Sequence, residues 1–204
     1  MKSPAKSSAD RAKSILRQSK GLLRTRDVLR LGIHPRVLYA LRDAGDLEQV
    51  GRGLYRMAQS TPLTNPDLSA VAARVPKGVI CLISALAFHE MTSQVPHEVY
   101  LAMERGSKPP KLAYPPLRLF WFTSDAFAEG VESHTIDGVT VRVYCPEKTL
   151  ADSFKYRHKI GLDVALEALK RYRQSKRLDV KALLRFACIC RVEAVMRPYL
   201  ESIL

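Results

Sequence analysis

The stretch GLLRTRDVLRLGIHPRVLYALRDAGDLEQVGRGLYRM, residues 21–57, decides the fold of the first third of the chain. A short helix is predicted over 26–31, with Thr25 as its cap. This helix ends at Gly32, because a glycine just past a helix supplies the left-handed residue that closes it. A second helix is predicted over 35–44, directly after this tight turn. The two helices and the turn between them are typical of a helix-turn-helix.

The flanking residues extend this pattern on both sides. Upstream, apolar residues recur at helical spacing over 9–20 and predict another helix. Downstream, 47–57 reads as two short strands around the glycine-rich tip 51–53, which predicts a hairpin. Three short helices followed by a basic hairpin indicate a winged helix-turn-helix.

The rest of the chain divides by composition. Residues 1–8 are small, polar and basic and predict a disordered arm before the winged helix of 9–59. Residues 60–66 carry two prolines and no periodicity, so we expect a linker there. Residues 67–204 alternate helical and strand patterns, and we expect a second, mixed α+β domain that ends in several helices. The predicted fold class is therefore α+β.

The elements of the second domain follow from periodicity and turn signals. Asp137-Gly138 between two alternating apolar runs is a strong hairpin signal. Strands are predicted over 79–83, 98–104, 118–122, 133–136 and 139–144, and helices over 67–75, 84–91, 147–158, 163–174, 179–191 and 194–204.

The charge balance points to a polyanionic partner. The sequence has 33 Lys and Arg against 20 Asp and Glu, a net charge of +13 at pH 7. Residues 1–60 hold 13 of the basic and 5 of the acidic side chains, net +8. Because the surplus coincides with the predicted helix-turn-helix, we expect double-stranded DNA as the partner of this region.

The helix predicted over 35–44 divides into two faces. Val37, Leu38, Leu41 and Ala44 form an inner face, with Arg36, Tyr39 and Asp43 opposite and Arg42 on the flank. An outer face of this kind can enter the major groove. The start of the preceding helix can anchor a phosphate, and the wing can contact the backbone or minor groove. The predicted DNA-contacting residues are Arg24, Thr25, Arg26, His34, Arg36, Tyr39, Arg42, Arg52 and Arg56.

These residues also carry a resemblance. The run 21–57 resembles the N-terminal winged helix of the AbiEi-type antitoxins of abortive-infection (type IV) toxin–antitoxin pairs, and GRGLYR at 51–56 is its most characteristic part. ICLISALAFH at 80–89 and PEKTLADSF at 146–154 are similar to phrases of that family's second domain. The resemblance implies a repressor that binds inverted repeats upstream of its own operon. It also implies an antitoxin against a neighbouring nucleotidyltransferase-type toxin, by direct or indirect action.

No catalytic, cofactor-binding or metal-ligating residue is predicted. The cysteines Cys81, Cys145, Cys188 and Cys190 lack metal-ligand spacing, and Cys188 and Cys190 point to different faces of their predicted helix. We expect reduced thiols. The longest apolar run, 79–88, is far shorter than the ~20 residues of a membrane span. We therefore expect no membrane association and a cytoplasmic protein.

Two clusters without acidic residues mark the second domain as a binding surface. One consists of Arg105, Lys108, Lys111 and Arg118, and the other of Lys170, Arg171, Arg173, Lys176 and Arg177. Either cluster is a solvated face or contacts nucleic acid or an acidic partner. Lys170, Arg171 and Arg173 are the predicted antitoxin surface. Two other functions stay open: a ligand-responsive winged-helix regulator, and a DNA-targeted nuclease.

Overall fold

The computed structural model describes residues 8–18, 21–60, 62–175 and 178–203. The chain groups into two compact units. The first is the chain up to Arg74 together with Thr135–Thr140, and the second is Val75–His134 together with Val141 onward. The predicted linker, 60–66, therefore lies within the first unit, and its role as a domain boundary stays a prediction. Of the predicted arm, 1–7 lie outside the described residues, and Ser8 begins the first helix.

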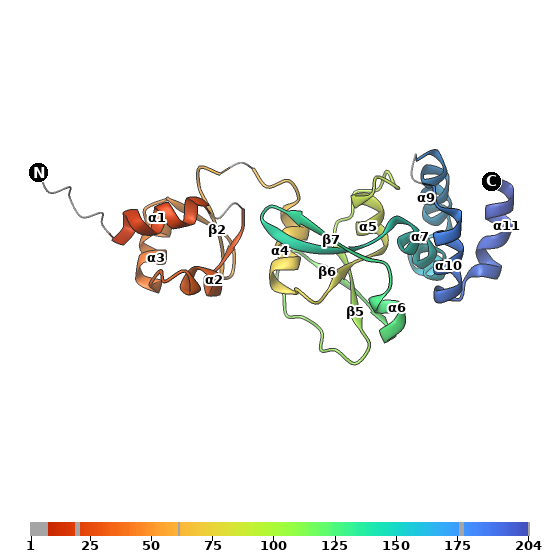
Figure 1. Cartoon of the computed structure of the whole chain (residues 1–204), viewed down its shortest axis with the longest axis horizontal. Coiled ribbons are helices and arrows are strands. Elements are labelled where there is room, and N and C mark those ends of the chain that lie inside the picture. The colour runs from red at the N-terminus through yellow and green to blue at the C-terminus, as the bar shows by residue number, and fades with distance from the viewer. Residues whose placement is uncertain (1–7, 19–20, 61, 176–177, 204) are drawn as a thin grey trace, which may run out of the picture. The chain divides into compact units, whose positions relative to one another are not determined.

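The first unit contains the predicted winged helix (Figure 1). Its three-stranded sheet has the order β1-β3-β2 with antiparallel pairing, and a bulge between Gln49 and Gly51 precedes the wing tip. The elements are α1 (Ser8–Gln18), β1 (Leu23–Arg24), α2 (Thr25–Arg30), α3 (Pro35–Asp43), β2 (Leu47–Gly51) and β3 (Leu54–Met57).

The turn between α2 and α3 is closed by backbone hydrogen bonds. Gly32 has φ +78° and donates its N–H to the Leu29 carbonyl (3.0 Å). Ile33 donates to the Val28 carbonyl (3.3 Å), which completes a Schellman motif. Val28 and Ile33 are also buried in the same core, so this hydrophobic contact fixes the direction in which the chain enters α3.

One apolar core holds the winged helix together. Its buried members come from every helix and strand of this region: Ala12, Leu16, Leu23, Val28, Ile33, Leu38, Leu41, Leu47 and Tyr55. An ion pair between Lys13 Nζ and Asp46 Oδ2 (2.8 Å) connects α1 to the turn between α3 and β2. The core is complete within residues 9–57.

The first unit continues through α4 (Pro66–Arg74) and the tip of the β7–β8 hairpin. The Asp137 carboxylate accepts hydrogen bonds from the Thr64 N–H (2.8 Å), the Asn65 N–H (3.2 Å) and the Ser69 hydroxyl (2.6 Å). The Asp137 carbonyl accepts one from the Leu22 N–H (2.9 Å). These bonds fix the start of α4 to the hairpin tip.

The second unit is built on a five-stranded mixed sheet in the order β6-β5-β4-β8-β7. Pairing is antiparallel for β4–β5 and parallel for β4–β8 and β5–β6. The Asp137-Gly138 hairpin is confirmed, with positive φ at both residues. The strands are β4 (Val79–Ile80), β5 (Val99–Glu104), β6 (Leu117–Phe122), β7 (Val131–Ile136) and β8 (Val139–Tyr144).

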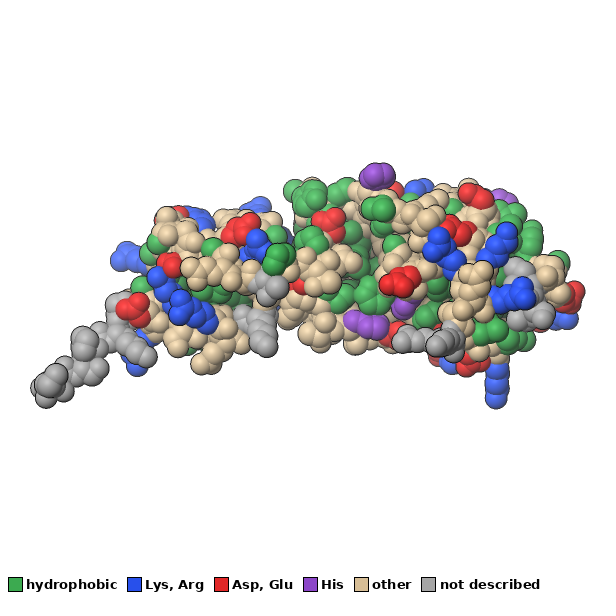
Figure 2. All heavy atoms as spheres, turned by 90° about the horizontal axis from the view of Figure 1, so that it is seen from above, with side chains coloured by type: hydrophobic (Ala, Val, Ile, Leu, Met, Phe, Trp, Pro, Cys, Tyr) green, Lys and Arg blue, Asp and Glu red, His purple; other side chains and the backbone are tan. Residues whose placement is uncertain are grey.

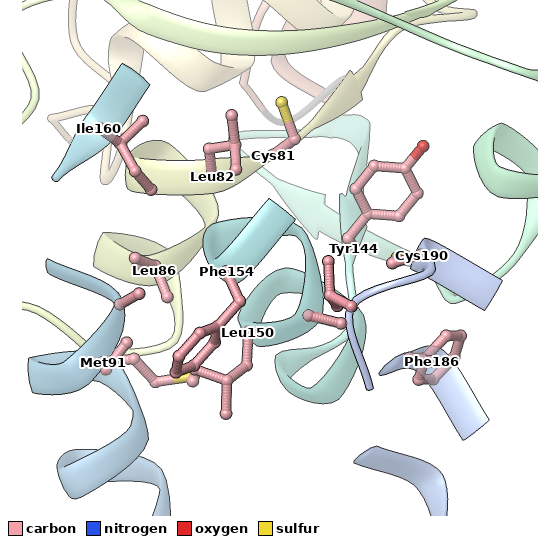
Figure 3. Close-up of a cluster of buried hydrophobic side chains, with 14 of the residues drawn as sticks. Cys81, Leu82, Leu86, Met91, Tyr144, Leu150, Phe154, Ile160, Phe186 and Cys190 are labelled. Carbon is pink, nitrogen blue, oxygen red and sulfur yellow. The ribbon is translucent and has the colours of Figure 1, made fainter. Parts of the chain in front are cut away.

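Helices complete this unit, and α7 lies at their centre, with α11 outermost in Figure 1. Figure 3 shows Leu150 and Phe154 of α7 beside Leu86 and Met91 in the core. The helices are α5 (Leu82–Phe88), α6 (Ser124–Ala128), α7 (Pro146–Lys155), α8 (Arg157–Ile160), α9 (Leu162–Gln174), α10 (Val180–Cys190) and α11 (Glu193–Ile203). The short helix α6 was not predicted. The strand predicted over 79–83 ends at Ile80, and helix α5 begins at Leu82.

Candidate nucleic-acid interface

Helix α3 exposes one narrow face. Leu38 and Leu41 are buried in the core, whereas Arg36, Tyr39, Ala40 and Asp43 are exposed and lie one turn apart on the other side. The predicted inner face is correct for Leu38 and Leu41 but wrong for Ala44. That residue is exposed because it follows the last turn of the helix as its C-cap.

The start of α3 is capped by a predicted contact residue. The Nδ1 atom of His34 accepts a hydrogen bond from the Arg36 N–H (3.2 Å). The exposed imidazole thereby stabilises the first turn of the helix, where Arg36 projects. The Arg36 guanidinium has no hydrogen bond or ion pair to any residue that the structure describes, so it is available to an external acceptor.

Arg42 is already paired. Its Nε and Nη2 atoms lie 2.9 and 2.8 Å from the Asp43 carboxylate, and its guanidinium stacks over the Tyr39 ring, 5.2 Å from the centroid. The hydrogen bond with Asp43 raises the pKa of this arginine. Arg42 therefore differs from Arg36, since its charge is locally neutralised and it orients Tyr39.

The wing places its two arginines differently. Arg52 is exposed at the tip, and its guanidinium has no partner in the described part of the chain. Arg56 on β3 pairs with Glu48, the residue directly opposite on β2 (2.6 Å). The tip itself is supported, because the Arg74 guanidinium donates to the Arg52 carbonyl (3.0 Å).

Three arginines surround one carboxylate on α2. Asp27 lies 3.9 Å from Arg24, 3.6 Å from Arg26 and 3.7 Å from Arg30. Arg24 is half-buried and also donates to the Ala72 carbonyl (3.4 Å), and burial lowers its pKa. Sequence reasoning missed Arg30, which helical spacing from Arg26 could have revealed.

Thr25 was predicted to cap α2, and this is wrong. The helix begins with Thr25, and Arg24 is the N-cap without a side-chain bond. The Thr25 hydroxyl instead donates to the Gly53 carbonyl (3.4 Å), which connects α2 to the wing. On the face that Figure 2 presents, basic side chains are interspersed with acidic ones, in keeping with these ion pairs.

The predicted antitoxin surface lies on α9. Lys170, Arg171 and Arg173 are exposed, and Arg171 pairs with Glu167 (2.9 Å). Glu167 also accepts hydrogen bonds from the Thr92 hydroxyl (3.1 Å) and the Ser93 N–H (2.9 Å). Arg171 is therefore an exposed side chain that is paired with a carboxylate already bound to Thr92 and Ser93. Lys176 and Arg177 lie outside the described residues.

A buried ion pair in α7 was missed by sequence reasoning. Lys148 and Asp152 are both fully buried, with Nζ and Oδ2 2.5 Å apart, and the Cys190 thiol donates to Asp152 Oδ1 (3.2 Å). The Lys148 ammonium also lies over the Tyr144 ring, 4.3 Å from its centroid. Burial raises the pKa of Asp152 and raises that of Cys190 to about 12. Because solvent does not reach these groups, the ion pair belongs to the core of the unit and is not open to a substrate.

The cysteines are free thiols, and Cys188 and Cys190 face opposite sides of α10, as predicted: Cys188 is exposed and Cys190 is buried. Within the described residues, no group of three or more His, Cys, Asp or Glu side chains could hold a metal ion. None of the helices described is long and apolar enough to cross a membrane.

Comparisons with known proteins agree with this architecture. Residues 10–58 match the family model described as a transcriptional regulator, AbiEi antitoxin, and this segment ends with β3. No curated protein matches the chain. The crystal structure of the RV2827C protein from Mycobacterium tuberculosis is similar with a TM-score of 0.60 and 12% identity. The similarity covers 87% of this chain and 69% of that one, and at this identity it concerns the fold alone.

Proposed function

Because residues 10–58 match the AbiEi antitoxin regulators and fold as a winged helix, we propose that the chain is a DNA-binding repressor of its own operon. The observation that carries this proposal is the outer face of α3. It exposes Arg36, whose guanidinium has no partner among the described residues, and Tyr39 beside it. A helix with such a face can enter the major groove.

The arginines then divide by role. Arg36, near the N-terminus of α3, contacts base edges, since recognition helices use their first turns for this purpose. Arg52 at the wing tip and the group of Arg24, Arg26 and Arg30 contact phosphates. Asp27 carries one charge among these three arginines, so the group keeps a net positive charge. Thr25, His34, Arg42 and Arg56 support or orient this surface through their contacts.

Titration of duplex DNA from the gene's own upstream region tests the proposal. Arg36→Ala should cost about 1–3 kcal/mol and relax the sequence preference, because a bidentate arginine–guanine contact is lost. Arg52→Ala should weaken binding to all sequences and reduce the slope of log K against log salt by about 1. Lys181→Ala removes the same charge from α10 and serves as the matched control. Equal affinities of wild type and the Arg36→Ala, Arg52→Ala double variant would contradict the assignment.

We further propose that the chain acts as an antitoxin against a nucleotidyltransferase-type toxin, and that residues 67–204 carry this activity. Lys170 and Arg173 support the proposal, since both are exposed on α9 without an ion pair in the described residues. They can contact an acidic toxin surface or the nucleic acid on which the toxin acts. Arg171 belongs to the same surface but is committed to Glu167.

Growth rescue on co-expression with the neighbouring toxin tests this role. Lys170→Glu with Arg173→Glu should impair protection without lowering the melting temperature, because exposed charges contribute little to stability. Reversal of Lys155 and Lys181, two other exposed lysines, makes the same charge change and is the control. Full rescue by the α9 variant would show that this cluster is only a solvated face. Loss of rescue in a stable Arg36→Ala, Arg42→Ala variant would instead place antitoxicity in DNA binding.

A further inference from the structure

The segment 105–116, here called the β5–β6 loop, is an unusual connection. β5 and β6 are parallel neighbours, with Val99 opposite Leu117 and Glu104 opposite Phe122. The chain must therefore return along the whole length of the strands, and it does so without a helix or strand of its own (Figure 1). Parallel strands usually need a helical crossover for this return.

The loop exposes basic and aromatic side chains at regular intervals. Arg105, Lys108, Lys111 and Tyr114 follow one another at every third residue, and all four are exposed. Between them, Ser107, Pro110 and Leu112 are half-buried, and Pro115 is buried. The loop therefore partly buries a few of its residues and exposes three cations and an aromatic ring to solvent.

Two exposed aromatic rings of this unit, one in the loop and one on β6, make no ring contact with the described residues. Tyr114 is 70% exposed and Trp121 on β6 is 41% exposed. No side-chain hydrogen bond or ring contact joins either ring to another residue in the ranges described. Other aromatic rings of this sheet are in contact: Tyr100 stacks on Phe120 with centroids 5.8 Å apart, and Phe122 lies 5.8 Å from Tyr144. The two exposed rings are therefore not part of the core.

The cations of the loop are also available. Lys108 and Lys111 have no ion pair with any described residue, and the sequence has no acidic residue from 105 to 118. Arg118 is different, because it is held by Glu98 (3.4 Å) and the Tyr100 hydroxyl (3.1 Å). The nearest acid along the chain is Glu104, directly before the loop.

We propose that the β5–β6 loop and Trp121 form a second nucleic-acid site, which binds single-stranded RNA or DNA. Lys108 and Lys111 neutralise backbone phosphates, while Tyr114 and Trp121 stack on bases. Phosphate-binding cations together with exposed aromatic rings are the features that recognise unpaired strands, because only an unpaired base offers its face for stacking. At ~3.3 Å per residue, the seven steps from Tyr114 to Trp121 separate them by at most ~23 Å, a distance that a strand of several nucleotides can reach across.

Trp121 makes the test direct, since it is the only tryptophan in the sequence. Titration of the full chain with 12-nucleotide oligo(rU) or oligo(dT) should quench its emission. Inorganic polyphosphate should bind more weakly, and neither polyphosphate nor a duplex of the same length, which the winged helix binds, should change the emission. Quenching by oligo(rU) alone or by oligo(dT) alone would identify RNA or DNA as the ligand.

Variants separate stacking from charge. Tyr114→Ala should weaken oligonucleotide binding about 5- to 100-fold, whereas Tyr114→Phe, which keeps the ring, should bind like wild type. Lys108→Ala with Lys111→Ala should reduce the salt slope by about 1.4, from about 0.7 for each phosphate contact on a single strand. Lys155→Ala with Lys181→Ala, at two exposed lysines of α7 and α10, is the control with the same charge change. Trp121→Phe is followed by anisotropy of a labelled oligonucleotide and should keep most of the affinity.

The Arg36→Ala, Arg52→Ala variant distinguishes this site from the winged helix. It should lose duplex binding and keep the quenching by single strands. If the chain does not bind its operator, the quenching of Trp121 emission by single strands is still expected, so the two proposals can fail separately. Absence of quenching by both oligonucleotides, equal binding of polyphosphate, or unchanged affinity in Tyr114→Ala would overturn the proposal.

Discussion

Lys148 and Asp152 stabilise the second unit only as a pair. Both side chains are removed from water, and the opposite charge 2.5 Å away compensates the desolvation of each. Lys148→Met should therefore lower the free energy of unfolding by about 3–5 kcal/mol, since it leaves a buried carboxylate without its cation. Chemical denaturation at pH 8 measures this loss.

The pH dependence of the Lys148→Met variant provides a check on this cause. Burial already raises the pKa of Asp152, and without lysine the carboxyl should take a proton on folding. A carboxyl with a folded pKa above its unfolded value loses stability as the pH rises. The deficit should therefore be smaller at pH 5 than at pH 8, and Lys148→Met with Asp152→Leu should recover part of it. A deficit independent of pH would indicate lost packing alone.

At the scale of residues, sequence patterns predicted which side chains are exposed better than they predicted which side chains form ion pairs with one another. Helical spacing placed Arg36 and Tyr39 outside and Leu38 inside, which the structure bears out. It did not predict that Arg56 faces Glu48, because that pairing depends on the register of the wing. Nor did it predict the Lys148–Asp152 pair, although the i,i+4 spacing was visible.

Among the elements, the turn before α3 depends on Gly32. Its φ of +78° lies in the left-handed region, where a side chain costs roughly 1–2 kcal/mol per residue. Apart from its two chain neighbours, no atom of the described residues lies within 4 Å of an added Cβ, so the cost of Gly32→Ala should be conformational only. We expect a loss of about 1 kcal/mol in chemical denaturation and a smaller loss for Gly32→Asn, because asparagine tolerates this region. Equal losses for both variants would point to another cause.

The start of α4 should respond to acid through Asp137. Burial tends to raise the pKa of this carboxyl, but the hydrogen bonds from Ser69, Thr64 and Asn65 outweigh it and leave the pKa lowered. A lowered pKa stabilises the fold above the unfolded value of about 3.9, and this contribution is lost as the pH falls through the folded pKa. The difference in melting temperature between wild type and Asp137→Asn should therefore narrow from pH 6 to pH 3. A constant difference would exclude the carboxylate as the cause.

At the scale of the molecule, the closed core of 9–57 predicts that the winged helix acts on its own. A fragment ending at residue 61 keeps that core and loses the Arg74 contact to the Arg52 carbonyl. It should remain folded by circular dichroism and bind the operator specifically, but more weakly than the full chain. A fragment ending at residue 74 restores the contact and is the comparison. A folded 61-residue fragment without sequence preference would refute the separation.

The sequence predicted local elements more completely than their assembly. Helix caps, glycine turns and the Asp137-Gly138 hairpin act between neighbours, so most boundaries were predicted to within a few residues. The parallel pairing of β5 with β6 and of β4 with β8 depends on residues far apart in the chain. The β5–β6 loop shows no helical periodicity, and nothing local predicts that it connects parallel strands.

The pairing of Ile80 in β4 with Val143 in β8 also orders events during synthesis. The winged helix has its whole core once Met57 has left the ribosome, whereas the central strand of the second sheet waits for β8. At about 5–20 residues per second, the intervening 87 residues from Met57 to Tyr144 take roughly 4–17 seconds to translate. During this interval the nascent chain already displays a folded α3 and wing, while β4 and β5 lack the strand that completes their sheet.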